Sequence, residues 1–294
     1  FVLLVLFLQY SLLLLSIFPE VVSGSTVCKS TSSNINNERI SIRKSDPDKA
    51  VEAASKLNDA INSKLDRLGY EKIHSEKKTN IGDIRVVSKH QLIDDGENAL
   101  VVKGELTAPT GTKPNANKAL DVPTGDGQVD IGAFAVYDRY LNEVRSLRVN
   151  AVAGYTAQLP DHLERRIPIS ETEFLTTDRE ELSRDLGDIA LLSIAMQYEF
   201  AFGLNLGASY SFQRLNKTSF EGSKYDASRY RLLEANTMQQ LHSTTLALGF
   251  STVEMYRQKT FKIPFQLNFT YSHPLAGVNV ARNDSYMFEL VMFF

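Results

Sequence analysis

The sequence is poor in the residues that several common kinds of site require. It holds a single cysteine, Cys28, in 294 residues, so no disulfide can form within the chain. Its five histidines are scattered, without the close spacing that a metal site needs. Acidic residues outnumber basic ones, 35 against 32, which gives no net attraction for nucleic acid. We therefore expect no metal, no cofactor and no nucleic-acid partner.

A long, uniformly hydrophobic run occurs at the start of the sequence. Residues 1–18 carry no charge, and small residues follow up to Gly24, which is typical of a secretory signal and its cleavage site. A membrane-anchor helix and an apolar strand retained in the fold are two further interpretations. We interpret residues 1–24 as a signal peptide, because a barrel strand should alternate in polarity and this run does not.

Helical periodicity is clearest between residues 47 and 68. Asp46 can cap the N-terminus of a helix, Pro47 suits the first turn, and Gly69 suits the C-terminal end. Apolar residues recur between these limits at intervals of three or four. The pattern predicts an amphipathic helix over 47–68, which would either cover a pore mouth as a plug or lid, or pack on loops for stability.

From Ile81 to the C-terminus the hydrophobic pattern has a period of two, which is typical of antiparallel strands with one apolar and one polar face. The predicted strands are 82–93, 97–108, 127–139, 143–158, 186–201, 203–216, 237–252, 260–273 and 283–294. Their connections alternate between short and long, as in outer-membrane barrels with short periplasmic turns and long outer loops. A soluble β-sandwich has no reason to sort its loops in this way.

Nine strands leave such a barrel one strand short, because outer-membrane barrels of one chain close with an even number. We expect at least one strand before residue 82, supplied by a short alternation at Ile40 and Ile42 or by the apolar start of the chain. The predicted fold is an all-β membrane protein, an antiparallel transmembrane β-barrel of 10 (alternatively 12) strands with one amphipathic helix in an N-terminal loop. The predicted domains are the signal peptide 1–24, a polar segment 25–81 and the barrel 82–294.

Several short motifs together resemble a known family. They are Pro-Thr-Gly at 109–111 and again at 123–125, Gly-Gln-Val-Asp-Ile-Gly at 127–132, Gly-Tyr at 69–70 and Ile-Gly-Asp-Ile at 81–84. These residues are similar to bacterial outer-membrane barrels of the meta-pathway of phenol degradation, a family distantly similar to the long-chain fatty-acid transporters. The similarity runs from about Val51 to Tyr155 and is looser from Leu186 to Phe294. It implies a barrel in the outer membrane of a Gram-negative bacterium, passage of small molecules, and no catalytic residues.

Charged residues on the predicted inner face are the candidate site. They would either line a constriction that selects solutes or cross-link the barrel wall. They are Arg85, Lys89, Lys103, Glu105, Asp130, Arg148, Glu199 and Glu289. Arg85 and Glu105 form the best predicted pair, opposite or diagonal across the first hairpin. Small inner residues such as Gly132 and Gly154 indicate that part of the lumen stays open.

The last predicted strand carries apolar residues on one face and an aromatic at its end. These residues are Tyr286, Phe288, Leu290, Met292 and Phe294. The resemblance implies that barrel-assembly machinery recognises a terminal strand of this form. The lipid bilayer, lipopolysaccharide and a small-molecule solute are the other expected partners.

The long predicted loop 159–185 holds eight acidic residues against four arginines, and we expect it to be solvated. For the whole chain we predict a channel or transporter for passive passage of small molecules, hydrophobic or aromatic ones among them, and no enzyme activity. The alternative is a structural or surface-interaction barrel, whose lumen is filled by side chains and whose outer loops make the contacts.

Overall fold

The computed structural model describes residues 47–74 and 80–293. The chain divides into two compact units, Phe1–Ile61 and Asn62–Phe294. The predicted signal peptide and the predicted short strand at Ile40 and Ile42 lie outside the described residues. Within those residues, no helix combines the length and the apolar composition of a membrane span.

Helix α3 spans Pro47–Arg67, which confirms the predicted helix to within one residue at its C-terminal end. The Tyr70 amide donates to the Leu65 carbonyl at 2.9 Å, and Gly69 between them has a φ of 69°. A residue with a side chain is strained at this φ, so glycine is well suited to terminate the helix. Leu65 near this end is buried, whereas Val51 in the first turns is exposed.

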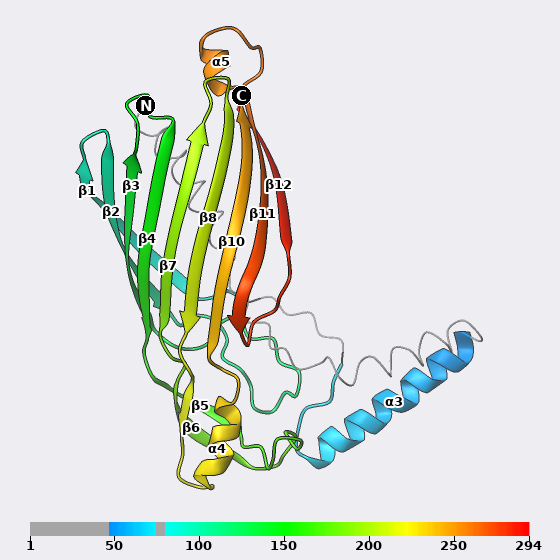
Figure 1. The fold of residues 1–294 in the computed structure, drawn as a ribbon. Helices are drawn as coiled ribbons and strands as arrows, with labels where there is room; N and C mark the ends of the chain where they lie inside the picture. The colour runs from blue at the N-terminus through cyan, green and yellow to red at the C-terminus, as the bar shows by residue number, and fades with distance from the viewer. Residues whose placement is uncertain (1–46, 75–79, 294) are drawn as a thin grey trace. The chain divides into compact units, whose positions relative to one another are not determined.

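Nine strands form one antiparallel sheet in which each strand pairs with the next in sequence order (Figure 1). The strands are β1 (Ile84–Asp94), β2 (Asn98–Ala108), β3 (Asp130–Tyr140), β4 (Leu147–Gln158), β7 (Ile189–Glu199), β8 (Leu204–Leu215), β10 (Gln239–Ser251), β11 (Phe265–Val278) and β12 (Ser285–Met292). All nine predicted strands are therefore present. Because successive strands are antiparallel and their number is odd, β1 and β12 at the two ends of this order run in the same direction.

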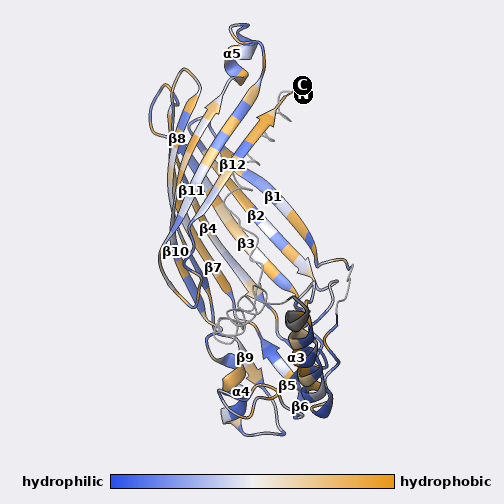
Figure 2. Ribbon diagram, turned by 90° about the vertical axis from the view of Figure 1, so that its right-hand side faces the viewer, coloured by the Kyte–Doolittle hydropathy of each residue, from blue (hydrophilic) through white to orange (hydrophobic). Residues whose placement is uncertain are grey.

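Alternate residues along each strand lie on two faces that differ in burial. Val136, Val152 and Ser193 are opposite one another on β3, β4 and β7, and are 7%, 7% and 8% exposed. We call the face that carries this row the inner face and the opposite face the outer face. Figure 2 shows hydrophilic and hydrophobic residues alternating along the strands.

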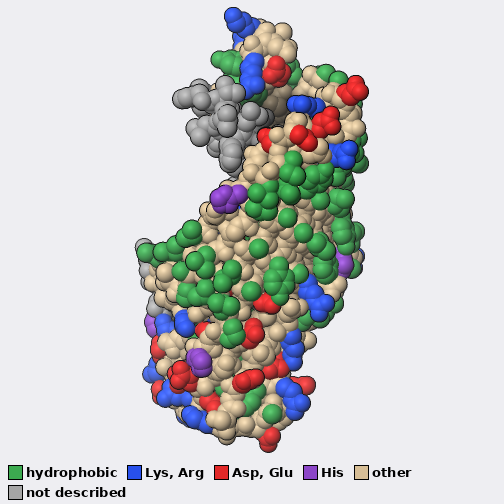
Figure 3. All heavy atoms as spheres, turned by 90° about the vertical axis from the view of Figure 1, so that its left-hand side faces the viewer, with side chains coloured by type: hydrophobic (Ala, Val, Ile, Leu, Met, Phe, Trp, Pro, Cys, Tyr) green, Lys and Arg blue, Asp and Glu red, His purple; other side chains and the backbone are tan. Residues whose placement is uncertain are grey.

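The outer face is apolar and exposed. Ile194, the neighbour of Ser193 on β7, is 54% exposed, and Leu206, Leu248 and Phe269 on the following strands are exposed as well. In Figure 3 hydrophobic side chains form a band across the middle of one side of the molecule, with acidic and basic side chains concentrated above and below it. The sheet thus presents to its surroundings the side chains that a soluble sheet normally buries.

Two of the predicted long loops are folded, contrary to expectation. Strands β5 (Asp161–Arg166), β6 (Arg179–Asp185) and β9 (Ser219–Glu221) form a second antiparallel sheet, and helix α4 (Ala227–Glu234) follows β9. We call residues 159–188 and 216–238 the loop cap. The prediction of a solvated loop at 159–185 is wrong, because a small apolar core orders it. This core holds Ile167, Leu182, Phe220 and Tyr230.

The connection between β10 and β11 also differs from prediction. Helix α5 (Val253–Arg257) and a turn with a φ of 60° at Lys259 occupy it, so the strand predicted to begin at residue 260 begins at Phe265. The buried Thr252 closes the connection, since its hydroxyl donates to the Ile263 carbonyl at 2.7 Å and accepts from the Phe265 amide at 2.9 Å.

Candidate functional site

The strand register places all eight predicted site residues on the inner face, but spreads them along the sheet. They are Arg85 and Lys89 on β1, Lys103 and Glu105 on β2, Asp130 on β3, Arg148 on β4, Glu199 on β7 and Glu289 on β12. Asp130 lies at the start of β3, where the long loop 109–129 enters, whereas Arg148 and Glu199 lie beside the short turns at the other end. The sequence therefore predicted a shared face and not a cluster.

The predicted pair of Arg85 and Glu105 is not formed. Arg85 is opposite Thr107 and therefore only diagonal to Glu105, as expected for one of the two predicted arrangements. Glu105 instead accepts from Lys103 Nζ at 2.7 Å. Lys103 and Glu105 are two residues apart on one strand and so share a face, which lets them pair without depending on the register of the edge strand β1.

Phe134 fills the inner surface beside this ion pair. Lys103 Nζ lies 3.9 Å from the centre of the Phe134 ring. A Cβ on Gly154 would overlap that ring, and a Cβ on Gly132 would lie 2.9 Å from its Cε2 atom. The expectation that these two glycines leave open space is wrong, because the Phe134 ring occupies the space that their missing side chains provide.

The inner face of the later strands carries small polar side chains that bond across the strands. The hydroxyls of Ser211 and Ser243 are 2.7 Å apart, and those of Thr245 and Ser272 are 2.8 Å apart. Nearer the C-terminus, Asn268 donates to Glu289 at 2.9 Å. The inner face of β8–β11 therefore carries small polar side chains at these positions, whereas the inner face of β2–β4 combines charged residues with Phe134, Val136 and Val152.

Arg148 shows how charges are held at the turn end of the inner face. It donates to Gln197 on β7 at 2.9 Å and lies 3.9 Å from the Asp138 carboxylate on β3. Asp138 also accepts from Asn150 at 3.1 Å. A charge held between two strands in this way cross-links the sheet.

The last strand presents its apolar residues on the outer face. Phe288 pairs with Phe269, and Leu290 pairs with Leu267, so these side chains share the face of the exposed band. Tyr286 stacks on Tyr271 with ring centres 5.0 Å apart. The predicted assembly residues Tyr286, Phe288, Leu290 and Met292 are all exposed there, and Phe294 lies outside the described residues.

The motifs that carry the resemblance interlock at the loop end of β1. The Thr110 hydroxyl donates to the Gly82 carbonyl at 2.9 Å, and the Thr124 hydroxyl donates to the Ile81 carbonyl at 2.9 Å. Asp83 accepts from the Gly111 amide at 2.7 Å. Both Pro-Thr-Gly motifs therefore bind the chain just before β1, and their role in this structure is to connect loops.

A second group of contacts centres on Arg166, a residue that the sequence analysis did not identify. Its guanidinium donates to the carbonyls of Leu68, Gly69, Ala116 and Thr176 at 2.6–2.8 Å. It also lies 3.8 Å from the centre of the Tyr70 ring. The Gly69-Tyr70 motif is thus the partner of Arg166, and this arginine joins three segments that are distant in sequence.

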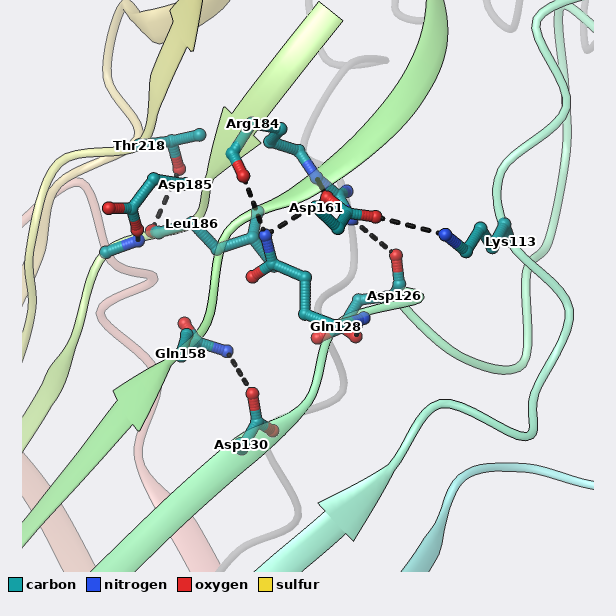
Figure 4. Close-up of polar contacts among 11 residues, drawn as sticks. Lys113, Asp126, Gln128, Asp130, Gln158, Asp161, Arg184, Asp185, Leu186 and Thr218 are labelled. Atoms are coloured by element: carbon teal, nitrogen blue, oxygen red, sulfur yellow. Dashed lines mark hydrogen bonds and ion pairs between the residues drawn. The ribbon is translucent and has the colours of Figure 1, made fainter.

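A polar cluster lies where the loop cap meets β3 and β4 (Figure 4). Arg184, only 2% exposed, donates to Asp161 at 2.9 Å and to the Asp126 carbonyl at 2.6 Å. Asp161 also accepts from Gln128 at 3.1 Å and from Lys113 at 3.2 Å. Burial alone would raise the pKa of Asp161, but the hydrogen bonds and the charge of Arg184 outweigh it and hold the pKa below its usual range.

No group of three or more metal-ligating side chains lies together among the described residues. Ser88 and His90 on the outer face of β1 form a hydrogen bond of 2.9 Å, which resembles part of a nucleophilic site. Within the described ranges no carboxylate orients the His90 ring, so the pair lacks the third group that activates such a serine.

Comparison with known proteins adds no relative. No family model matches the chain, and no curated protein matches it at a significant level. The resemblance to the outer-membrane barrels of phenol degradation therefore stays a prediction.

Proposed function

We propose that this chain forms a closed β-barrel in a bacterial outer membrane and serves as a channel for passive passage of small molecules. The observation that carries the proposal is the exposed apolar outer face opposite a mostly polar inner face, continued over nine strands. Contiguous apolar surface of this extent marks a contact with lipid or with another protein. The strands have 8 to 14 residues, against the ~9–11 that a transmembrane strand needs.

The positions of tyrosine on the outer face support a membrane setting. Tyr137 and Tyr198 lie near the ends of β3 and β7 at the short turns, while Tyr155 and Tyr286 lie near the opposite ends of β4 and β12. Two rings of aromatic residues bordering an apolar band are typical of outer-membrane barrels, because aromatic rings favour the interface between lipid and water.

Closure of the barrel requires one more strand than the nine described. Edge strands β1 and β12 run in the same direction, so a strand antiparallel to both would fit between them and bring the count to ten. Closure also removes both exposed edges, which would otherwise invite aggregation.

The alternative is a structural or surface-interaction barrel, and two observations favour it. The Phe134 ring already covers the glycines that would widen the lumen. The loop cap is folded around its own core, as a surface built for contacts would be. We prefer the channel, because the inner face of β8, β10 and β11 carries the small hydroxyl side chains of Ser211, Ser243, Thr245 and Ser272.

Solute flux into vesicles would test the proposal. We expect reconstituted protein to pass benzoate faster than arabinose, because Phe134, Val136 and Val152 make one side of the lumen apolar; protein-free vesicles correct for leakage through lipid. Phe134→Ala should raise the flux of both solutes, whereas Phe269→Ala on the outer face should leave it unchanged. Absence of protein-dependent flux in the native chain and in Phe134→Ala would overturn the channel in favour of the structural barrel.

A further inference from the structure

The connection between β10 and β11 holds a pocket that the proposed solute path does not use. The pocket has a volume of about 460 Å³ and lies beyond the short-turn end of the sheet, at helix α5 (Figure 1). Three cationic and two aromatic residues line it, namely Tyr256, Arg257, Lys259, Phe261 and Lys262. None of the described residues in this lining is acidic, so the pocket suits an anion that also has an apolar part.

Most of the positive charge at this pocket is uncompensated. Glu254 is the one acid in the connection 252–264, and it is shared between Arg257, at 3.7 Å, and Gln258, which donates to it at 3.1 Å. In the part of the chain that the structure describes, neither Lys259 nor Lys262 forms an ion pair, and both residues are exposed. Two ammonium groups are therefore free to meet an anion from outside the chain.

Hydrogen bonds of the backbone fix the shape of the connection. The Met255 carbonyl accepts from the Thr260 amide at 2.9 Å, from the Thr260 hydroxyl at 3.0 Å and from the Phe261 amide at 3.2 Å. The Lys259 amide donates to the Tyr256 carbonyl at 3.0 Å, and the positive φ of Lys259 turns the chain back on itself. Because the backbone under the cations is ordered before a ligand arrives, binding costs less conformational entropy.

A row of aromatic rings joins the pocket to the apolar outer face. The Phe261 ring centre lies 6.1 Å from that of Phe265, which lies 6.0 Å from that of Phe250. Phe265 is opposite Met292 and Phe250 is opposite Leu267, so both phenylalanines belong to the outer face. Phe265 is also the first residue of β11. The cations of the pocket therefore lie just beyond the end of the apolar face.

We propose that this pocket binds the headgroup of an anionic phospholipid. The acyl chains of such a lipid would cover the outer face, while its phosphate would meet Arg257, Lys259 and Lys262, because basic residues near a membrane surface attract anionic lipids. Tyr256 and Phe261 would lie at the interface that aromatic rings favour. Short turns of outer-membrane barrels face the periplasm, which favours a phospholipid over lipopolysaccharide. The inference rests on the proposed membrane setting, and it does not depend on whether the barrel conducts.

Native mass spectrometry of the full chain in detergent micelles, titrated with lipid, would test the site. Phosphatidylglycerol should bind more tightly than phosphatidylcholine with the same acyl chains, because choline cancels the charge of the phosphate. Lys259→Gln combined with Lys262→Gln should weaken the binding of phosphatidylglycerol roughly thirtyfold. Lys72→Gln combined with Lys224→Gln is the charge-matched control, since both lysines are exposed and neither lies in this connection. The control should bind as the native protein does.

Lys259→Arg combined with Lys262→Arg keeps both charges and should retain the binding, which separates loss of charge from loss of folding. Equal affinity of the native protein for the two lipids, or an equal loss in the control, would refute the pocket and leave the membrane setting intact. Binding of neither lipid would contradict both the pocket and the membrane setting. Displacement of phosphatidylglycerol by an equal concentration of glycerol phosphate, which has the headgroup charge without acyl chains, would refute the assignment to a lipid.

Discussion

Arginine substitutions along β7 would decide whether the outer face contacts lipid. Leu192, Ile194 and Met196 point outward and are almost equally exposed, at 54%, 54% and 53%. Ile194 is the sixth of the 11 residues of the strand and so lies near its centre. Differences in burial cannot separate these positions, so any difference in their tolerance of arginine must come from depth in a membrane.

In lipid, Ile194→Arg should cost ~2–4 kcal/mol of unfolding free energy, because the midplane of the bilayer solvates the charge poorly. Tyr198→Arg, at the interface end of the same strand, should cost about 0–1 kcal/mol. In water, the same changes on an exposed surface would usually stay within about 0.5 kcal/mol. The predicted gap between centre and edge is therefore several times the effect expected for a soluble sheet.

Denaturant titrations in lipid vesicles would measure these free energies. Val144→Arg is the matched control, because Val144 is a branched aliphatic residue in a short turn and is 83% exposed. It should be neutral in both settings. Equal and small losses at Ile194, Tyr198 and Val144 would show that the outer face meets water or a protein partner, and the membrane assignment would fail.

Three further predictions concern the inner wall, the loop connections and the cap. A double-mutant cycle of Lys103→Met and Glu105→Gln should give a coupling of about 0.5–3 kcal/mol, and strict additivity would remove the pair. Gly125→Ala should lower the free energy of unfolding by about 1–3 kcal/mol, since the new Cβ would overlap the Asp83 carboxylate. Gly104→Ala is the control, because a Cβ there meets no other atom within 4 Å. Equal losses in the two variants, measured by denaturant unfolding, would contradict the packing argument. Burial opposes ionisation of Glu180, but its hydrogen bonds hold its pKa below the ordinary value. Ionised Glu180 therefore stabilises the loop cap fully above about pH 4.3, and this stabilisation is lost as the pH falls through the lower folded-state pKa. Near-ultraviolet circular dichroism of the tyrosines should show the loss, and Glu180→Gln should remove this dependence on pH.

The nine strands could be predicted because their environment differs on the two faces. A strand such as β8 alternates Leu206, Ala208 and Tyr210 with Gly207 and Ser209, and this period of two is visible without any tertiary information. The start of strand β11 could not be predicted from this periodicity. Its apolar alternation continues backward into the α5 connection, where Thr252 rather than periodicity decides where pairing begins.

The strands of the loop cap could not be predicted, because they are short and have no regular alternation of apolar and polar residues. Its strands have 6, 7 and 3 residues, and β6 reads Arg-Glu-Glu-Leu-Ser-Arg-Asp, with one apolar side chain, Leu182. Order there depends on polar contacts between segments, such as those of Arg166 and Glu180, which no local pattern encodes. In the candidate site, the alternation of residues along each strand predicts which side chains share the inner face. It does not predict that Glu105 pairs with Lys103, because that choice depends on side-chain geometry.

The residues that carry the family resemblance differ from those that form the proposed solute path, and substitutions can test this difference. Both Pro-Thr-Gly motifs bind the segment just before β1, and Gly69-Tyr70 binds Arg166. The proposed solute path is formed instead by Phe134 and the hydroxyl pairs of β8–β11. Thr124→Val should therefore lower the free energy of unfolding by about 1 kcal/mol through the lost hydrogen bonds, with the ratio of benzoate to arabinose flux unchanged. Ser243→Leu on the inner face should change that ratio in favour of benzoate. A change of the flux ratio in Thr124→Val, with none in Ser243→Leu, would place solute selection in the motif rather than in the wall.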